Sequence, residues 1–440
     1  MKQPQENSIL HSSQYMCIKP HENPILRILS VTVPATFVQT VYSEALTAQQ
    51  KNSQPYGLHQ KTAPLSYIKH VYQEHIIEQV HEFLFKFFVL NVLYNELRNQ
   101  KLILAGTPRL TSITTDENQN TVYNFVATLF PTMDILEWKY FPFKAPKRKR
   151  YKDLDRQVEL FIEEEEHNRE HNVQTHICID DWINFDVTLA SDTQEPLLDG
   201  YQENLWLRLG NEEADTIYQE LFLGKKIGDV IITCNEGLRE YFNEQSGSHF
   251  NFYVTIKDIV PHAYVCMEQL KKQFRIKTNK ELHQKLIEVF SYRNDISQRK
   301  SMIDEACKLM LSKHQFHAPH FLVLRREEEL LATIQTNPDY LVYKMQKDFR
   351  RSIEQLAEGQ VKEAILMDQI AYSERLEISH EDVKNYLNLM KRQRIREFLH
   401  FRIPNTKVRE QETPVITQDL LFSCLREKTL NYIIYHLTKK

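Results

Sequence analysis

Two clusters of histidines are the residues of this sequence whose spacing could support metal chemistry. The segment HNREH, residues 167–171, matches the H-x-x-E-H pattern in which two histidines on one helical face bind zinc. A zinc site also needs a third ligand and a walled cavity, whereas the surrounding segment is strongly hydrophilic. A solvated helix face is therefore the favoured interpretation of residues 167–171, and zinc-dependent catalysis is the minor alternative.

The second cluster, HQFHAPH, places His314, His317 and His320 close together. Pro319 interrupts the segment, so the three imidazoles do not share one helical face and adventitious metal binding is the alternative. The cysteines are scattered without a CxxC pair, which fits free thiols in a reducing cytoplasm and predicts no zinc site. No phosphate-binding motif of the GxxxxGK[ST] or GxGxxG type occurs. We therefore expect no metal and no cofactor, and no Ser-His-Asp or Cys-His arrangement is readable.

The length and the net charge of the chain restrict its domain count and its function class. A chain of 440 residues predicts about two to four domains, and its net charge of −4 excludes a protein that coats nucleic acid generally. The basic run KAPKRKRYK, residues 144–152, could contact nucleic acid, but a solvated linker paired with the following acidic helix is favoured. The polar amino terminus has no signal-peptide pattern, and the apolar stretch at 83–93 is too short to span a bilayer. Contact with membranes is not expected.

Hydrophobic periodicity predicts an α+β multidomain protein. Alternating apolar residues predict strands at 25–34 and 121–130, and a long helix is expected from about Leu65 to Gln100. Six of the nine glycines fall between positions 200 and 247, which marks one turn-rich antiparallel β domain. Its strands are expected within DWINFDVTLA, NLWLRLG, DVIITC and FNFYVTIKDIV. Helices dominate from residue 261, and capping boxes are predicted at 278–281 and 379–382.

The order of these segments resembles bacterial trigger factor, the ribosome-bound chaperone, over nearly the whole chain. RILSVTVPATFVQTVYSEAL is similar to the family's opening strand and helix, and GLHQKTAP aligns without gaps on its G-F-R-x-G-K-x-P docking loop. FHAPHFLVLRREEELL and VKEAILMDQIAYSERLEISHEDV resemble its late helical segments. The resemblance implies a mobile tail (1–20), an α+β ribosome-binding domain (21–134), a linker with a basic run and a helix (135–171), an FKBP-like antiparallel β-sheet domain (172–260) and an all-α chaperone domain with arms (261–440).

The resemblance also implies where the chain contacts the ribosome. The family's docking loop corresponds to residues 57–64, and the candidate ribosome-binding residues are Gly57, Leu58, His59, Lys61 and Pro64. The family's loop arginine is His59 here, so a permanent five-donor cation is replaced by a side chain that is mostly neutral at pH 7. Weakened or rewired docking to ribosomal RNA and protein is expected.

The β domain resembles the FKBP-type prolyl isomerase module. Carrying the family's pocket across residue by residue gives the candidates Phe185, Leu198, Asp199, Leu205, Ala214, Asp215, Tyr218, Tyr241 and Phe252. Asp215 replaces an aliphatic residue, and a carboxylate is costly to desolvate beside a proline ring. The fold is expected to persist while turnover is low, so the resemblance leaves enzymatic activity open.

Taken together, the resemblance implies a cytoplasmic, ATP-independent chaperone that meets nascent chains at the tunnel exit of the large ribosomal subunit. Its expected partners are ribosomal RNA and protein, unfolded nascent polypeptides and, off the ribosome, a second copy of the chain; neither DNA nor a membrane is expected. Roles in protein export and cell division follow from the family. The alternatives are an active prolyl isomerase, a ribosome-independent holdase and a scaffold for one fixed partner.

Overall fold

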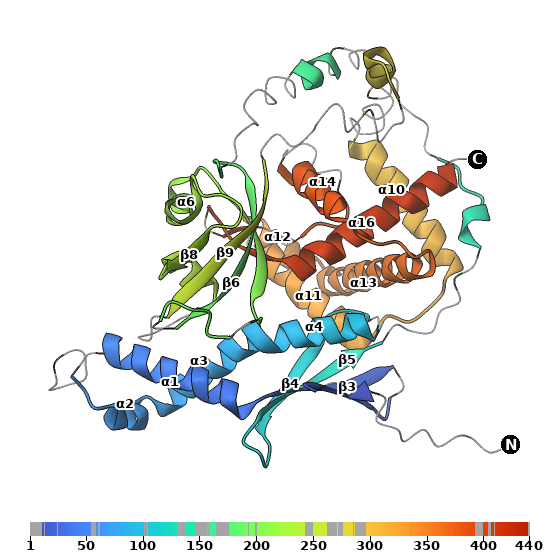
Figure 1. The fold of residues 1–440 in the computed structure, drawn as a ribbon. Coiled ribbons are helices and arrows are strands. Elements are labelled where there is room, and N and C mark those ends of the chain that lie inside the picture. Colours follow the sequence, from blue (N-terminus) through green and yellow to red (C-terminus); the bar gives the residue numbers. More distant parts are fainter. Residues whose placement is uncertain are drawn as a thin grey trace. The chain divides into compact units, whose positions relative to one another are not determined.

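The chain folds into two compact units, each assembled from segments far apart in the sequence. The computed structural model describes residues 11–438 except 13, 24, 54–58, 60–61, 101, 103, 130–134, 136, 146–155, 157, 164–175, 192, 199, 243–249, 262–270, 272–275, 285, 287–295, 336, 392–398, 404–405 and 409. The first unit, here the sheet unit, comprises Met1–Leu129, Gln174–His262 and Pro404–Asp419. The second, the helical unit, comprises Phe130–Val173, Ala263–Ile403 and Leu420–Lys440. The α+β multidomain class expected from the sequence is confirmed (Figure 1).

The first antiparallel sheet lies in the amino-terminal part of the sheet unit. Its strands, in the spatial order β1-β2-β3-β5-β4, are β1 (His11–Ser12), β2 (Met16–Pro20), β3 (Leu26–Val33), β5 (Thr121–Thr128) and β4 (Arg109–Thr115). The strands predicted within 25–34 and 121–130 are confirmed. The mobile tail expected over residues 1–20 is too long, because Met16 to Pro20 pair with β3 and Met16 and Ile18 are buried.

Helices pack on the buried face of this sheet (Figure 1). They are α1 (Ala35–Asn52), α2 (Leu65–Val71), α3 (Gln73–Leu84), a π-helical turn η1 (Phe85–Val89) and α4 (Leu90–Asn99). The single helix predicted from Leu65 to Gln100 is wrong at Tyr72, whose backbone (φ −111°, ψ 15°) leaves the helical range and separates α2 from α3. The π turn widens the helix where Phe87 and Phe88 are both fully buried.

The second antiparallel sheet has the strand order β12-β7-β6-β9-β8. Its elements are β6 (Trp182–Ala190), β7 (Glu203–Arg208), β8 (Val230–Thr233), β9 (Asn251–Val260) and β12 (Val415–Ile416), with the helices η3 (Glu213–Asp215), α6 (Thr216–Phe222) and α7 (Glu236–Tyr241). All four strands predicted between 172 and 260 are confirmed. The apolar core beneath this sheet is continuous with the core beneath the first sheet. Phe83 of α3, for example, contacts Phe250 at 4.8 Å between ring centroids.

The fifth strand of that sheet comes from the far end of the sequence. Residues 406–416, here the carboxy-terminal hairpin, contain β10 (Lys407–Val408), β11 (Gln411–Glu412) and β12. β10 pairs with β11, and β12 pairs with β7 through Val415 opposite Trp206 and Ile416 opposite Leu205. The expectation that residues 261–440 form one all-helical domain is therefore wrong for this segment.

The helical unit has helices of different lengths around an apolar core. Those within the described residues are η2 (Trp138–Tyr140), α10 (Ile296–Lys313), α11 (His320–Gln335), α12 (Tyr340–Lys344), α13 (Phe349–Ser373), α14 (His380–Lys391) and α16 (Thr417–Thr438), the last beginning in the sheet unit. Both predicted capping boxes are confirmed by reciprocal bonds between Thr278 and Glu281 and between Ser379 and Asp382. The segment expected as a linker over 135–171 instead contributes Trp138, which is buried in this core beside Tyr432.

Candidate functional site

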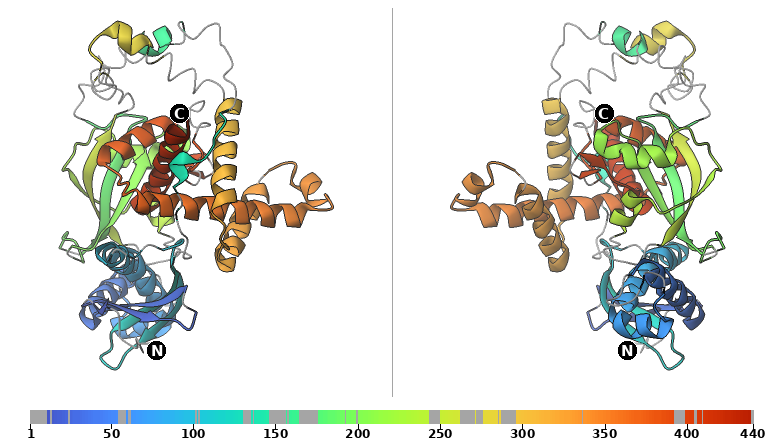
Figure 2. Two further views of the ribbon diagram at one scale, coloured as in Figure 1. Left: turned by 90° about the vertical axis from the view of Figure 1, so that its right-hand side faces the viewer. Right: turned by 90° about the vertical axis from the view of Figure 1, so that its left-hand side faces the viewer.

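The helical unit carries an arm with an apolar end. α11 and α13 pack along each other, and Arg326 on α11 donates from Nε to Oε1 of Gln360 on α13 at 2.7 Å. α12 lies between them in the chain, just before the amino-terminal end of α13, and Figure 2 shows this end of α13 projecting away from α10 and α16. Leu341 and Val342 on α12 are 66% and 64% exposed, and Met345 just after it is 86% exposed.

This arm tip, residues 340–345, is unusual for a folded surface. Single exposed apolar residues are common, but a contiguous run of large ones marks a surface for an apolar partner. α12 buries none of its residues, so packing does not explain its composition. A flexible methionine and aliphatic neighbours suit contact with many different apolar sequences.

The predicted docking loop is described only in part. His59 is exposed, while Gly57, Leu58 and Lys61 lie outside the described residues. The loop's second half is anchored, because Gln50 Nε2 donates to the carbonyl of the buried Ala63 at 2.7 Å and Pro64 precedes the first turn of α2. The loop therefore joins α1 to α2, with His59 facing solvent.

The candidate residues of the isomerase-like module converge in space. Phe185, Leu205, Tyr218 and Phe252 are all buried and belong to one apolar cluster, together with Leu198. Phe185 meets Phe222 at 4.9 Å and Phe252 meets Phe242 at 5.5 Å between ring centroids. Tyr241 packs at the edge of this cluster, Ala214 is partly exposed, and Asp199 lies outside the described residues. Burial raises the pKa of both Tyr218 and Tyr241, so both phenols stay protonated.

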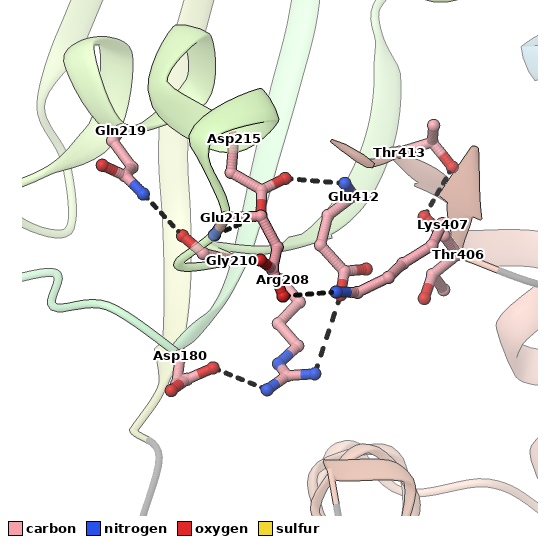
Figure 3. A network of polar contacts seen from close by, with 10 residues as sticks. All are labelled: Asp180, Arg208, Gly210, Glu212, Asp215, Gln219, Thr406, Lys407, Glu412 and Thr413. Atoms are coloured by element: carbon pink, nitrogen blue, oxygen red, sulfur yellow. Dashed lines mark hydrogen bonds and ion pairs between the residues drawn. The ribbon is translucent and has the colours of Figure 1, made fainter. Parts of the chain in front are cut away.

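Asp215 lies at the centre of a polar network, shown in Figure 3. Its carboxylate is fully buried; Oδ1 accepts from the backbone N–H of Glu412 at 2.7 Å and Oδ2 accepts from Glu212 N at 3.2 Å. The backbone N–H of Asp215 donates to the Glu212 carbonyl at 3.0 Å. Both the side chain and the amide that would meet a substrate in an FKBP-type pocket are thus engaged within the chain.

The same network also contains ion pairs that link the carboxy-terminal hairpin to β7 (Figure 3). Arg208 on β7 pairs with Asp180 at 2.5 Å and faces Oε1 of Glu412 at 3.6 Å, and Lys407 Nζ lies 3.9 Å from that oxygen. Burial raises the pKa of Glu412, and the two cations work against that shift. Glu412 is therefore a buried carboxylate on β11 of the hairpin, and it faces Arg208 on β7.

Sequence reasoning missed Arg208, Glu412 and Lys407. The hydrogen bond from Glu412 to Asp215 joins residues 197 positions apart, and no spacing rule links them. A weak signal existed in Pro414, since a proline beside Val415 and Ile416 fits the end of an edge strand better than a helix.

One group of side chains could hold a metal ion among the residues that the structure describes. Cys307, Glu363 and His400 offer ligand atoms that all lie within 4.8 Å of one another. The predicted alternative at 167–171 lies outside the described residues. Of the second histidine cluster, His314 is buried with its Nδ1 2.9 Å from the Met310 carbonyl, while His317 and His320 are exposed.

Within the described ranges, every helix is too short or too polar to traverse a lipid bilayer.

Several known proteins are similar to this chain. Residues 16–163 match the family described as bacterial trigger factor protein, at its amino-terminal domain. Trigger factor of Geotalea daltonii is 21% identical over 418 residues, covering 91% of this chain and 94% of its own length. Trigger factor of Geobacter sp. strain M21 is 22% identical over 397 residues, covering 84% and 87%. A solved structure of the trigger factor chaperone covers 96% of this chain and 99% of its own, at 13% identity and a TM-score of 0.39. One domain of this chain, residues 16–163, thus matches the trigger factor family, and relatives named trigger factor align over most of both chains.

Proposed function

We propose that the chain is an ATP-independent chaperone that holds unfolded polypeptides with its helical arm and docks on the ribosome through residues 57–64. The observation that carries the holding activity is the arm tip, where Leu341, Val342 and Met345 project into solvent on an element that buries nothing. Dispersed apolar contacts without a deep anchor give weak, fast and broadly specific binding, as a nascent chain requires.

The docking part of the proposal rests on similarity to trigger factors and on the anchored loop. That similarity supports contact with the large ribosomal subunit near the tunnel exit and, with it, a cytoplasmic location. His59 offers an exposed hydrogen-bonding group, and the bond from Gln50 to Ala63 keeps the end of the loop in place. An imidazole offers fewer hydrogen-bond donors than the five of a guanidinium, so docking through His59 should be weaker than docking through an arginine.

Prolyl isomerase activity is the weaker candidate. Catalysis would require a client proline to enter beside Asp215, whose carboxylate and amide are already bonded to Glu412 and Glu212. Displacing these bonds leaves a buried carboxylate without partners, at a cost of about 1–3 kcal/mol or more. Low turnover on tetrapeptide substrates is therefore part of the proposal.

The test is suppression of aggregation by the full chain. A chemically denatured client is diluted into the protein, and light scattering is followed as the chaperone concentration rises. The triple variant Leu341→Ser, Val342→Ser, Met345→Ser should need several-fold more protein for the same suppression. A matched control, Ile227→Ser with Val230→Ser, removes exposed apolar area from the isomerase-like module and should leave suppression unchanged.

Two outcomes would contradict this function. If both variants suppress aggregation as well as the parent chain, the arm tip does not hold clients. If the parent chain fails to suppress aggregation yet turns over prolyl peptides, the isomerase is the activity.

A further inference from the structure

We propose that Cys307, Glu363 and His400 form a binding site for one divalent metal ion of the zinc type. Sγ of Cys307, a carboxylate oxygen of Glu363 and a ring nitrogen of His400 lie within 4.8 Å of one another. They come from α10, from α13 and from the described stretch 399–403 after α14. Tertiary folding of the helical unit alone brings these three ligand types together.

The donor set selects the class of metal. Thiolate, imidazole and carboxylate together suit zinc and cobalt, whereas calcium and magnesium prefer oxygen ligands only. In a tetrahedral zinc site these donors lie roughly 3.3–3.7 Å apart. His400 Nε2 and Glu363 Oε2 are 2.9 Å apart as a hydrogen-bonded pair, so these two atoms would separate by less than about 1 Å to take up positions around an ion.

The histidine is held in place by a supporting shell. The backbone N–H groups of His400 and Phe401 both donate to Oε2 of Glu427, at 3.0 and 3.1 Å. Oε1 of Glu427 pairs with Arg299 on α10 at 3.2 Å. The main chain at His400 is thus tied to two helices, which is the preorganisation that a metal site needs.

Burial and several carboxylates act on the thiol. Cys307 is buried in the apolar core of the helical unit. Burial raises the pKa of its thiol, the carboxylates of Glu363, Asp304 and Glu427 raise it further, and the guanidinium of Arg299 opposes the rise. A bound divalent ion would neutralise the thiolate and the Glu363 carboxylate, and the thiol proton would leave to solvent.

The exposure of the site to solvent and the number of ligands it offers are also compatible with a bound metal ion. The side chains of Glu363 and His400 are 22% and 29% exposed, so an ion can enter from solvent and keep a water as its fourth ligand. Once bound, the ion would bridge α10, α13 and the stretch at residue 400. Because the unfolded chain lacks this geometry, binding would raise the stability of the helical unit.

The test uses cobalt and then zinc on the full, tag-free chain, reduced and stripped of metal with a chelator. Cobalt bound to a thiolate gives a charge-transfer absorption in the near ultraviolet that free or histidine-bound cobalt lacks. We expect this band to saturate at one equivalent of cobalt and to disappear when zinc is added. Zinc should also raise the apparent melting temperature.

Matched variants decide whether the band belongs to this site. Cys307→Ser should abolish it, whereas Cys424→Ser, at another buried cysteine of the same unit, should leave it intact. His400→Gln changes a partly exposed side chain with little risk to folding, and it should weaken cobalt binding at least about tenfold. His317→Gln, at an exposed histidine of the second cluster, should have no effect.

The proposal is overturned if the parent chain shows no saturable thiolate band, if the band survives in Cys307→Ser, or if His400→Gln binds as tightly as the parent. Each result is independent of the chaperone assay, because cobalt absorption is read without any client.

Discussion

Glu203 places a carboxylate in the interior of the isomerase-like module. It lies on β7 and is buried, and desolvation raises its pKa to about 7, against the attraction of Lys86. A raised pKa in the folded state means that the folded protein holds the proton more tightly than the unfolded chain. The contribution of Glu203 to stability is therefore greatest in acid and is lost as pH rises from about 4.5 to about 7.

Glu203→Gln should remove this pH dependence. The amide is neutral at every pH, so the variant should be more stable than the parent at pH 8, by up to about 3 kcal/mol, with the difference shrinking towards pH 5. Apparent melting temperatures of both proteins at the two pH values measure this. An equal difference at pH 5 and pH 8 would contradict the assignment.

Gly237 is required by close contact with an aromatic ring. A Cβ atom at this position would lie 2.7 Å from Cζ of Tyr218, whose ring is buried. Gly237→Ala should therefore lower stability by about 1–3 kcal/mol through overpacking. Gly359→Ala is the control, because nothing lies within 4 Å of its added Cβ in α13.

The control should change stability in the opposite direction, by up to about 1 kcal/mol, since alanine is the better helix former. Thermal melts of both variants decide the matter. Stabilisation by both substitutions would show that the Tyr218 ring yields.

At the scale of elements, α13 and α16 are joined by a buried ion pair. Arg426 donates two hydrogen bonds to Asp368, at 2.8 and 2.6 Å, and burial raises the pKa of Asp368 while Arg426 opposes the rise. The ion pair fixes the position of α13 relative to α16. The cost of desolvating the two charges offsets much of their electrostatic attraction.

Arg426→Leu should destabilise the helical unit by about 3–5 kcal/mol, because it leaves Asp368 buried without its cation. Adding Asp368→Leu should recover most of that loss. The double-mutant cycle is read from urea unfolding of the parent, both single variants and the double variant. An additive double variant would mean that the two side chains do not depend on each other.

The carboxy-terminal hairpin makes the second contact between elements that can be tested, through its pairing with β7 and its hydrogen bond to Asp215. Asp215→Ala removes the acceptor of the Glu412 N–H and should free residues 411–416 from β7 at a cost of about 1–3 kcal/mol. Hydrogen exchange should accelerate over that segment while β6 and β9 keep their protection. Unchanged exchange at 411–416 would show that strand pairing alone holds the hairpin.

At the scale of the whole molecule, the proposed docking of residues 57–64 on the ribosome can be tested directly. The variant Gly57→Ala, Leu58→Ala, His59→Ala should pellet with ribosomes several-fold less than the parent. The fraction of either protein that pellets should fall as the salt concentration rises. Co-sedimentation at two salt concentrations measures this. Equal pelleting of parent and variant would move the docking contact elsewhere in the chain.

Much of this architecture follows from local patterns. Period-2 alternation located β3, β5, β6, β7, β8 and β9, and the side-chain spacing of TNKE and SHED located two helix starts, because both signals depend on neighbours a few residues apart. The candidate pocket residues Phe185, Leu205, Tyr218 and Phe252 do converge. The break at Tyr72 was not predictable, since the apolar period continues through it.

Local sequence patterns indicated the fold class, most strands and the resemblance to trigger factor. The strand that closes the second sheet, and the surroundings of Asp215 and Cys307, depend on tertiary packing. β12 contributes two residues to the sheet, too few to show a periodicity, and its pairing with β7 spans some two hundred positions. A carboxylate or a thiol has no readable role until the chain brings its partners within hydrogen-bonding distance, and that step depends on packing across the whole unit.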